Sequence, residues 1–139
     1  ASKYQESKSL FNKAIDQAPG NVDAKIKLAY VLLFDANGLT EAEKLLMESE
    51  KQSFDLFYFY ACKGLLHLRK NNQAEAQKML DLAIKFGGES HSWTLELKGD
   101  LLSLKGNNSE AISLWRKAQA KGWNSSWLNR KIEAGKWVE

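Results

Sequence analysis

The chain repeats itself about every 35 residues, and this period constrains the fold more than any other feature of the sequence. Four segments carry a small residue, a bulky apolar residue four places later and a second small residue three places after that. Their starts lie 35, 34 and 35 residues apart. A fixed period of about 20 to 50 residues is the signature of a repeat protein, in which each unit packs on its neighbours. The four copies are Ser7/Phe11/Ala14, Ala42/Leu46/Ser49, Ala76/Leu80/Ala83 and Ala111/Trp115/Ala118.

The spacing within each copy predicts a helix. Offsets of four and three residues place three side chains on the same face of an α-helix. Small residues on that face let a neighbouring helix approach closely, and the bulky residue fills the remaining space. We therefore expect Ala42, Ala76 and Ala111 to be buried where helices cross.

A second helix is expected before each of the last three copies. Gly64 and Gly99 each stand 12 residues before the first small residue of their copy, whereas Ala29 stands 13 residues before its own. One extra residue is therefore expected in the first turn, near Asn37 and Gly38. Asn and Gly are common in all of these turns because they tolerate the left-handed backbone conformation.

Helix starts have their own signals. Thr40 and Glu43 have the spacing of a capping box, and Ser109 has the place of an N-cap residue. Taken together, the repeats and turns predict an all-α fold of eight helices, at about residues 3–18, 22–36, 40–52, 55–70, 73–86, 90–105, 109–121 and 125–134.

The helices group into one domain over residues 1–139. It comprises a half repeat, three full repeats and a closing helix whose apolar side chains, such as Trp127 and Leu128, accompany charged residues, such as Lys131. Because the first unit has only its second helix, the chain is expected to be the C-terminal part of a longer array. The expected units are the half repeat 3–18, the repeats 22–52, 55–86 and 90–121, and the capping helix 125–134.

These repeats resemble the tetratricopeptide repeat (TPR) family over essentially the whole chain. Tyr60 with Gly64, and Leu95 with Gly99, fill the first-helix positions of the family motif, and Pro19 fills the position at the end of a second helix. The resemblance implies a right-handed α-solenoid of antiparallel helix pairs, with about three and a half TPR-like repeats and a C-terminal capping helix.

The chain also departs from the family pattern. Lys25 stands where an aromatic residue is usual, and Gly88 and Trp123 stand where proline is usual. Residues 131–139 resemble the closing segment of many bacterial members, which implies a bacterial protein.

Charge and hydropathy argue against several classes of partner. The formal net charge of +3 comes from 20 basic and 17 acidic side chains that are interspersed along the sequence. This balance does not favour a nucleic-acid partner, and no apolar run approaches the roughly 18 residues that span a bilayer. Cys62 is the single cysteine, so no intramolecular disulfide can form. The expected protein is soluble, and its compartment stays open between the cytoplasm and the bacterial periplasm.

Groups that could support catalysis are sparse. His67 and His91 lie 24 residues apart without a cysteine or carboxylate at metal-ligand spacing, and no histidine is placed to activate Cys62. Glu96 and Asp100 lie four residues apart on one helix face, where such carboxylates are common. We therefore expect no enzyme, no metal and no cofactor.

The resemblance implies a protein-protein interaction scaffold that binds a peptide or helix of a protein partner in a concave groove. Tyr30, Phe34, Tyr58, Leu65, Trp93 and Leu97 are expected to form a continuous, partly exposed apolar strip, unless several of them turn into the core. The residues transferred from the family's groove positions are Lys27, Tyr30, Phe34, Tyr58, Cys62, Leu65, Arg69, Trp93, Glu96, Leu97 and Asp100.

Two alternatives stay open. The chain could be a structural segment that packs on further repeats of its own protein or on a second copy of itself. An RNA-binding helical repeat is less favoured, because polar base-reading positions do not recur between the copies.

Overall fold

The computed structural model describes residues 3–125 and 127–138, and over these residues every regular element is a helix. The predicted all-α fold of eight α-helices is confirmed. Short helical turns, η1 (Glu50–Gln52) and η2 (Ile84–Gly88), extend two of them. The α-helices are α1 (Lys3–Gln17), α2 (Val22–Leu32), α3 (Leu39–Ser49), α4 (Phe57–Arg69), α5 (Gln73–Ala83), α6 (Ser92–Leu104), α7 (Asn108–Ala120) and α8 (Leu128–Ala134).

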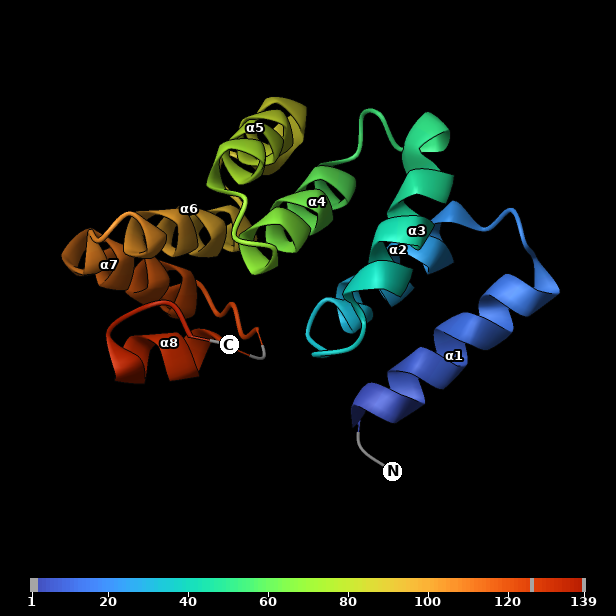
Figure 1. Cartoon of the computed structure of the whole chain (residues 1–139), viewed down its shortest axis with the longest axis horizontal. Helices are drawn as coiled ribbons and strands as arrows, with labels where there is room; N and C mark the ends of the chain where they lie inside the picture. Colours follow the sequence, from blue (N-terminus) through green and yellow to red (C-terminus); the bar gives the residue numbers. More distant parts are fainter. Residues whose placement is uncertain (1–2, 126, 139) are drawn as a thin grey trace.

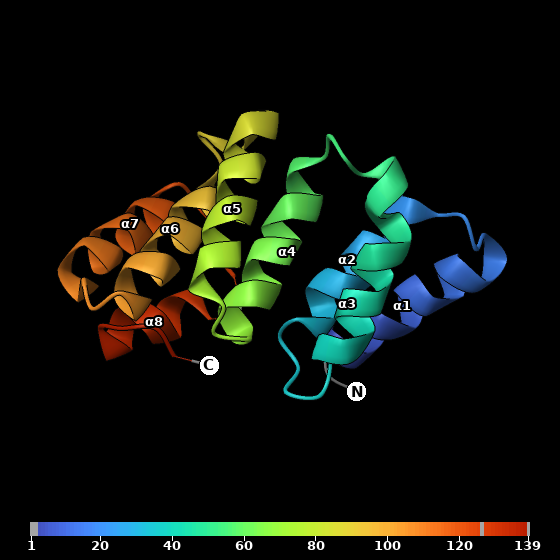
Figure 2. The ribbon, with the colours of Figure 1, turned by 45° about the horizontal axis from the view of Figure 1, so that its top comes forward.

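The helices follow one another in space in the order of the sequence, from α1 at one end to α7 and α8 at the other (Figure 1). Three hairpins, α2–α3, α4–α5 and α6–α7, pack side by side, and α2, α4 and α6 contact one another in turn (Figure 2). The last helix, α8, turns back and packs against α7. This arrangement places the first helix of each hairpin in one layer and the second helices in another.

The small residues of the repeat lie where their spacing predicted. Ala42, Ala76 and Ala111 are at most 1% exposed, and Leu80 and Trp115 are buried beside them. Without a larger side chain at these positions, the two helices of each hairpin can approach closely. In α1, by contrast, no residue is buried, and α2 is the main helix on which it packs.

Two of the hairpin turns repeat the same hydrogen bonds 35 residues apart. The N–H of Asn72 donates to the carbonyl oxygen of His67 at 2.8 Å, and that of Asn107 donates to Leu102 at 2.8 Å. Both bonds close the C-terminal end of a helix, and in each turn the preceding residue has a positive φ. The α2–α3 turn is longer than these two by three residues instead of the predicted one, because α2 already ends at Leu32.

The predicted side-chain caps are not formed. Thr40 is the second residue of α3 and Ser109 is the second residue of α7, so both lie inside the first turn. The residues before these helices, Gly38 and Asn107, make no side-chain cap bond. Gly38 is needed for a different reason, since a Cβ atom there would lie 2.2 Å from the carbonyl oxygen of Leu32.

Gly64 and Gly99 occupy equivalent positions in successive repeats, yet alanine should affect them in opposite ways. A Cβ at Gly64 would meet its nearest neighbour, Met79 Cβ, at 3.8 Å, whereas one at Gly99 would lie 2.5 Å from Trp115 Nε1. We expect Gly64→Ala to stabilise the fold by about 0.5 to 1 kcal/mol through helix propensity. Gly99→Ala should destabilise it by about 1 to 3 kcal/mol through overpacking. Urea unfolding measures both, and shifts in the same direction would contradict this packing.

In the part of the chain that the structure describes, none of the helices has both the length and the apolar character needed to cross a bilayer.

Candidate interaction groove

A groove of about 550 Å³ opens between α2 and the start of α4. Apolar and aromatic side chains make up most of its surface, and one wall comes from the segment that follows α7. The residues that line it are Asp23, Ile26, Lys27, Tyr30, Leu56, Phe57, Tyr58, Cys62 and Trp123.

Tyr30 forms a fixed wall of the groove. Its half-buried ring packs edge-to-face on Phe34, with centroids 5.1 Å apart, and on Trp93 at 5.0 Å. Burial, with a further contribution from the negative charge of Glu96, raises the pKa of the Tyr30 hydroxyl. A tyrosine hydroxyl is protonated at neutral pH even at its ordinary pKa, so this one can donate a hydrogen bond.

Tyr58 forms the opposite, open side. It is the second residue of α4 and is 53% exposed, while its ring packs against Phe57 at 5.2 Å and Trp93 at 5.9 Å. Leu56, directly before α4, is also exposed. Large apolar side chains that stay accessible at the edge of a hollow are typical of contact surfaces.

A pair of opposite charges lies at the α2 edge. Lys27 Nζ is 2.9 Å from Asp23 Oδ2, one helical turn away, and both side chains are exposed. Such a pair contributes only a few tenths of a kcal/mol to stability. Both groups therefore remain able to exchange this contact for one with a ligand.

Four of the eleven predicted groove residues line this hollow: Lys27, Tyr30, Tyr58 and Cys62. Cys62 lies at its floor and is fully buried, and burial raises the pKa of its thiol. It is therefore a packing residue, as the absence of a paired histidine in the sequence suggested.

The chain after α7, here called the tail (residues 121–125 and 127–138), covers three other predicted groove residues. Trp123 stacks on Trp93 with centroids 6.1 Å apart. Trp127 packs edge-to-face on Phe34 at 4.8 Å, and the guanidinium of Arg69 lies 5.0 Å from the Trp127 ring. Arg69 also donates to two backbone carbonyl oxygens of the α2–α3 turn, those of Leu33 at 2.8 Å and Asp35 at 3.0 Å.

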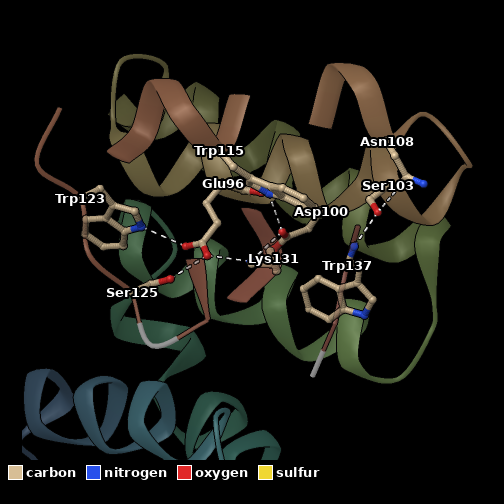
Figure 3. A network of polar contacts seen from close by, with 9 residues as sticks. All are labelled: Glu96, Asp100, Ser103, Asn108, Trp115, Trp123, Ser125, Lys131 and Trp137. Atoms are coloured by element: carbon tan, nitrogen blue, oxygen red, sulfur yellow. Dashed lines mark hydrogen bonds and ion pairs between the residues drawn. The ribbon is translucent and has the colours of Figure 1, made fainter. Parts of the chain in front are cut away.

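A buried network of polar groups holds the tail against α6 (Figure 3). Lys131 Nζ lies 2.6 Å from Glu96 Oε2 and 2.7 Å from Asp100 Oδ1. Glu96 also accepts hydrogen bonds from Trp123 Nε1 at 2.9 Å and from the Ser125 hydroxyl at 2.7 Å. Tail residues on both sides of position 126 thus converge on one carboxylate.

The network contains one ammonium and two carboxylates. Burial, with a smaller contribution from the nearby Glu96, raises the pKa of Asp100 to about 7 against the attraction of Lys131. Burial alone would lower the pKa of Lys131, but the two carboxylates outweigh it and raise that pKa. The two shifts have opposite meanings for the ion pair, since Lys131 is held charged while Asp100 favours its neutral form. One cation shared by two anions at hydrogen-bond distance explains both, and it keeps Lys131 charged.

The predicted apolar strip is wrong as a continuous exposed surface. Leu65, Trp93 and Leu97 are at most 3% exposed, because neighbouring helices and the tail cover them. Two further predicted groove residues, Glu96 and Asp100, are likewise closed to a partner, since they are buried against Lys131.

The sequence interpretation also missed several positions. Lys131, counted among the charged side chains of the closing helix, is 1% exposed. Of the five lining residues outside the predicted eleven, Asp23 and Ile26 stand at groove positions of the repeat family that the chain resembles, while Leu56, Phe57 and Trp123 do not. The aromatic run at residues 57–60 is the one local signal that could have indicated Leu56 and Phe57.

No group of three or more His, Cys, Asp and Glu side chains within residues 3–125 and 127–138 is arranged to hold a metal ion. Comparisons of the chain with protein-family models, with curated proteins and with solved structures gave no match. Interpretation of the function therefore rests on the geometry of the groove and the tail.

Proposed function

We propose that this chain is a non-enzymatic protein-interaction module that binds a peptide or helix of a partner protein in the groove between α2 and α4. The observation that carries the proposal is the hollow of about 550 Å³, whose walls are mostly apolar and aromatic and in which Tyr58 is half exposed. Sites of this size with mostly apolar walls and a few polar groups are the usual form of ligand pockets.

The walls are suited to binding because their rings already pack on neighbouring rings. Tyr30 is held between Phe34 and Trp93, and Tyr58 is packed against Phe57. A partner would therefore lose little binding free energy in ordering these side chains. Tyrosine and tryptophan are also the residues most often found at the energetic centre of protein interfaces.

A right-handed α-solenoid of the tetratricopeptide type is part of the same proposal. It is supported by the 35-, 34- and 35-residue spacing of the small residues and by equivalent turns 35 residues apart. In such arrays the first helices of the repeats form the binding surface. The groove lies between two such helices, α2 and α4.

The sequence offered Cys62, Glu96 and Asp100 as groups that could support catalysis. All three are buried in the structure, which supports a non-enzymatic role. The Cys62 thiol is buried and its pKa is raised. Glu96 and Asp100 hold Lys131. A nucleophile or a general base needs access to substrate, and these three side chains lie in the interior.

Selection of a random peptide library on the purified chain, followed by binding titrations, tests the proposal. We expect Tyr58→Ala to weaken the selected peptides at least tenfold, because the side chain forms the open side of the groove. Met47→Ala is the matched control, since Met47 is 71% exposed on α3 and does not line the groove. Equal affinities of the two variants would contradict the proposal, provided circular dichroism shows the same helical content.

A second candidate is self-association through α1. Leu10 is 65% exposed on a helix that buries no residue, so this face is open to another helix. Sedimentation of the chain should then show a concentration-dependent dimer that Leu10→Glu abolishes. A monomer at all concentrations would rule this candidate out.

A further inference from the structure

We infer that the groove is a subsite for one aromatic side chain of an extended peptide, an inference that rests on the proposed function. The tail of the chain already places an indole beside this hollow. Trp123 stacks on Trp93 and at the same time lines the groove. The open space is therefore continuous with an intramolecular interface that a tryptophan has filled.

The chemistry of the walls favours an aromatic ring. Four rings line the hollow, those of Tyr30, Phe57, Tyr58 and Trp123. Aromatic rings prefer edge-to-face and offset-stacked contacts, and walls of this kind offer both faces and edges. The surrounding rings already pack in this way, since Tyr30 meets Trp93 at an angle of 82°.

The floor disfavours a charged side chain. Ile26 and Cys62 are buried there and offer no group that could pair with a charge. Burying an unpaired charge is far more costly than burying an apolar ring. An acidic or basic residue of the ligand would therefore have to stay at the edge, near Lys27 and Asp23.

The volume of the groove and its hydrogen-bond donors favour a ligand that inserts an aromatic ring together with the peptide groups on either side of it. About 550 Å³ exceeds the volume of any single side chain, so a ring leaves space for neighbouring peptide groups. The Tyr30 hydroxyl, which is protonated at neutral pH, and the Lys27 ammonium can donate hydrogen bonds to peptide carbonyl oxygens.

Three blocked pentapeptides test the inference. They are identical glycine peptides with tryptophan, leucine or glutamate at the centre, titrated into the isotopically labelled full chain by two-dimensional NMR. We expect the tryptophan peptide to bind at least about fivefold more tightly than the leucine peptide, with the glutamate peptide weakest. Shifts should concentrate at residues 26–30 and 56–62.

Three variants test where the peptide binds. Tyr58→Ala should weaken the tryptophan peptide about tenfold, while Met47→Ala should leave it unchanged. Tyr30→Phe keeps the ring, so the preference for tryptophan over leucine should persist. Equal affinity of the tryptophan and leucine peptides, shifts outside the groove, or no binding at about 10 mM peptide would each overturn the inference.

Failure of this inference can be separated from failure of the proposed function. If library selection yields peptides that depend on Tyr58 but lack aromatic residues, the groove binds peptides and the aromatic subsite is wrong. If no selected peptide depends on Tyr58, both are wrong.

Discussion

Replacement of Lys131 by methionine is expected to lower the free energy of unfolding by about 3 to 5 kcal/mol at neutral pH. The ammonium is 1% exposed and lies within 2.7 Å of carboxylate oxygens of both Glu96 and Asp100. Methionine fills a similar volume but leaves Glu96 and Asp100 buried without a cation, so each must stay charged and unpaired or take up a proton. Most of the expected loss comes from these uncompensated charges, because the attraction itself is largely offset by desolvation.

Urea unfolding followed by far-ultraviolet circular dichroism measures this loss, with Lys136→Met as the control. Lys136 lies in the same tail and is exposed, so its variant should stay within about 0.5 kcal/mol of the parent. Adding Glu96→Gln and Asp100→Asn to Lys131→Met should recover most of the stability, since the buried charges are then gone. If Lys131→Met is no worse than Lys136→Met, the buried ion pair does not exist in solution.

Unfolding of the Lys131→Met variant should begin in the tail. Lys131 belongs to α8, and its two partners belong to α6, so the variant releases the segment that carries Trp123, Trp127 and Trp137. Local opening of a weakly held element precedes global unfolding when its contacts are few. We expect a red shift of tryptophan emission at urea concentrations below those that melt the helices.

The helices and their crossings were predictable because a repeat encodes the same contact several times. Ala76 and Ala111 lie 35 residues apart, and each is buried for the same reason. A pattern that depends on the period of the helix and on residue size is local, so sequence alone can indicate it. Packing between units then follows from the repetition.

Which of the predicted groove residues are exposed and which are buried was not predictable in the same way. Tyr58 and Trp93 lie 35 residues apart at equivalent repeat positions, yet one is 53% exposed and the other 2%. Part of the difference comes from Trp123, which stacks on Trp93, whereas the equivalent residue one repeat earlier, Gly88, has no side chain to cover Tyr58. The repeat pattern says nothing about such a contact.

The burial of Lys131 could not be predicted from the sequence either. Arg130, Lys131 and Glu133 all read as polar residues of a short closing helix, and only Lys131 is buried. Its partners lie 31 and 35 residues earlier in the chain, and its burial depends on how the tail returns to α6. No local feature of residues 130–133 distinguishes the buried cation from the exposed ones.

The second large effect concerns pH. Burial raises the pKa of Asp100 from the ordinary 3.8 to about 7, so the folded protein binds this proton more readily than the unfolded chain does. The contribution of Asp100 to stability is therefore complete below about pH 4 and is lost as the pH rises through about 7. The difference between the two pKa values corresponds to at most about 4 kcal/mol.

The two histidines act in the opposite direction over the same range. Burial lowers the pKa of both His67 and His91 below the ordinary 6.5. Their contribution is present above about pH 6.5 and is lost as the pH falls through their folded-state pKa values. The pH profile of the parent chain alone therefore does not report on Asp100, and a comparison with a variant is needed.

Asp100→Asn isolates the effect because it keeps an oxygen that can accept from Lys131 Nζ and Trp115 Nε1, while Lys131 remains paired with Glu96. We expect the stability of the variant relative to the parent to improve by about 2 to 3 kcal/mol between pH 5 and pH 8, because only the parent loses the Asp100 contribution over that interval. The histidines cancel in this difference. Urea unfolding of both proteins at half-unit pH steps measures it, and parallel profiles would mean that Asp100 titrates near its ordinary pKa in the folded chain.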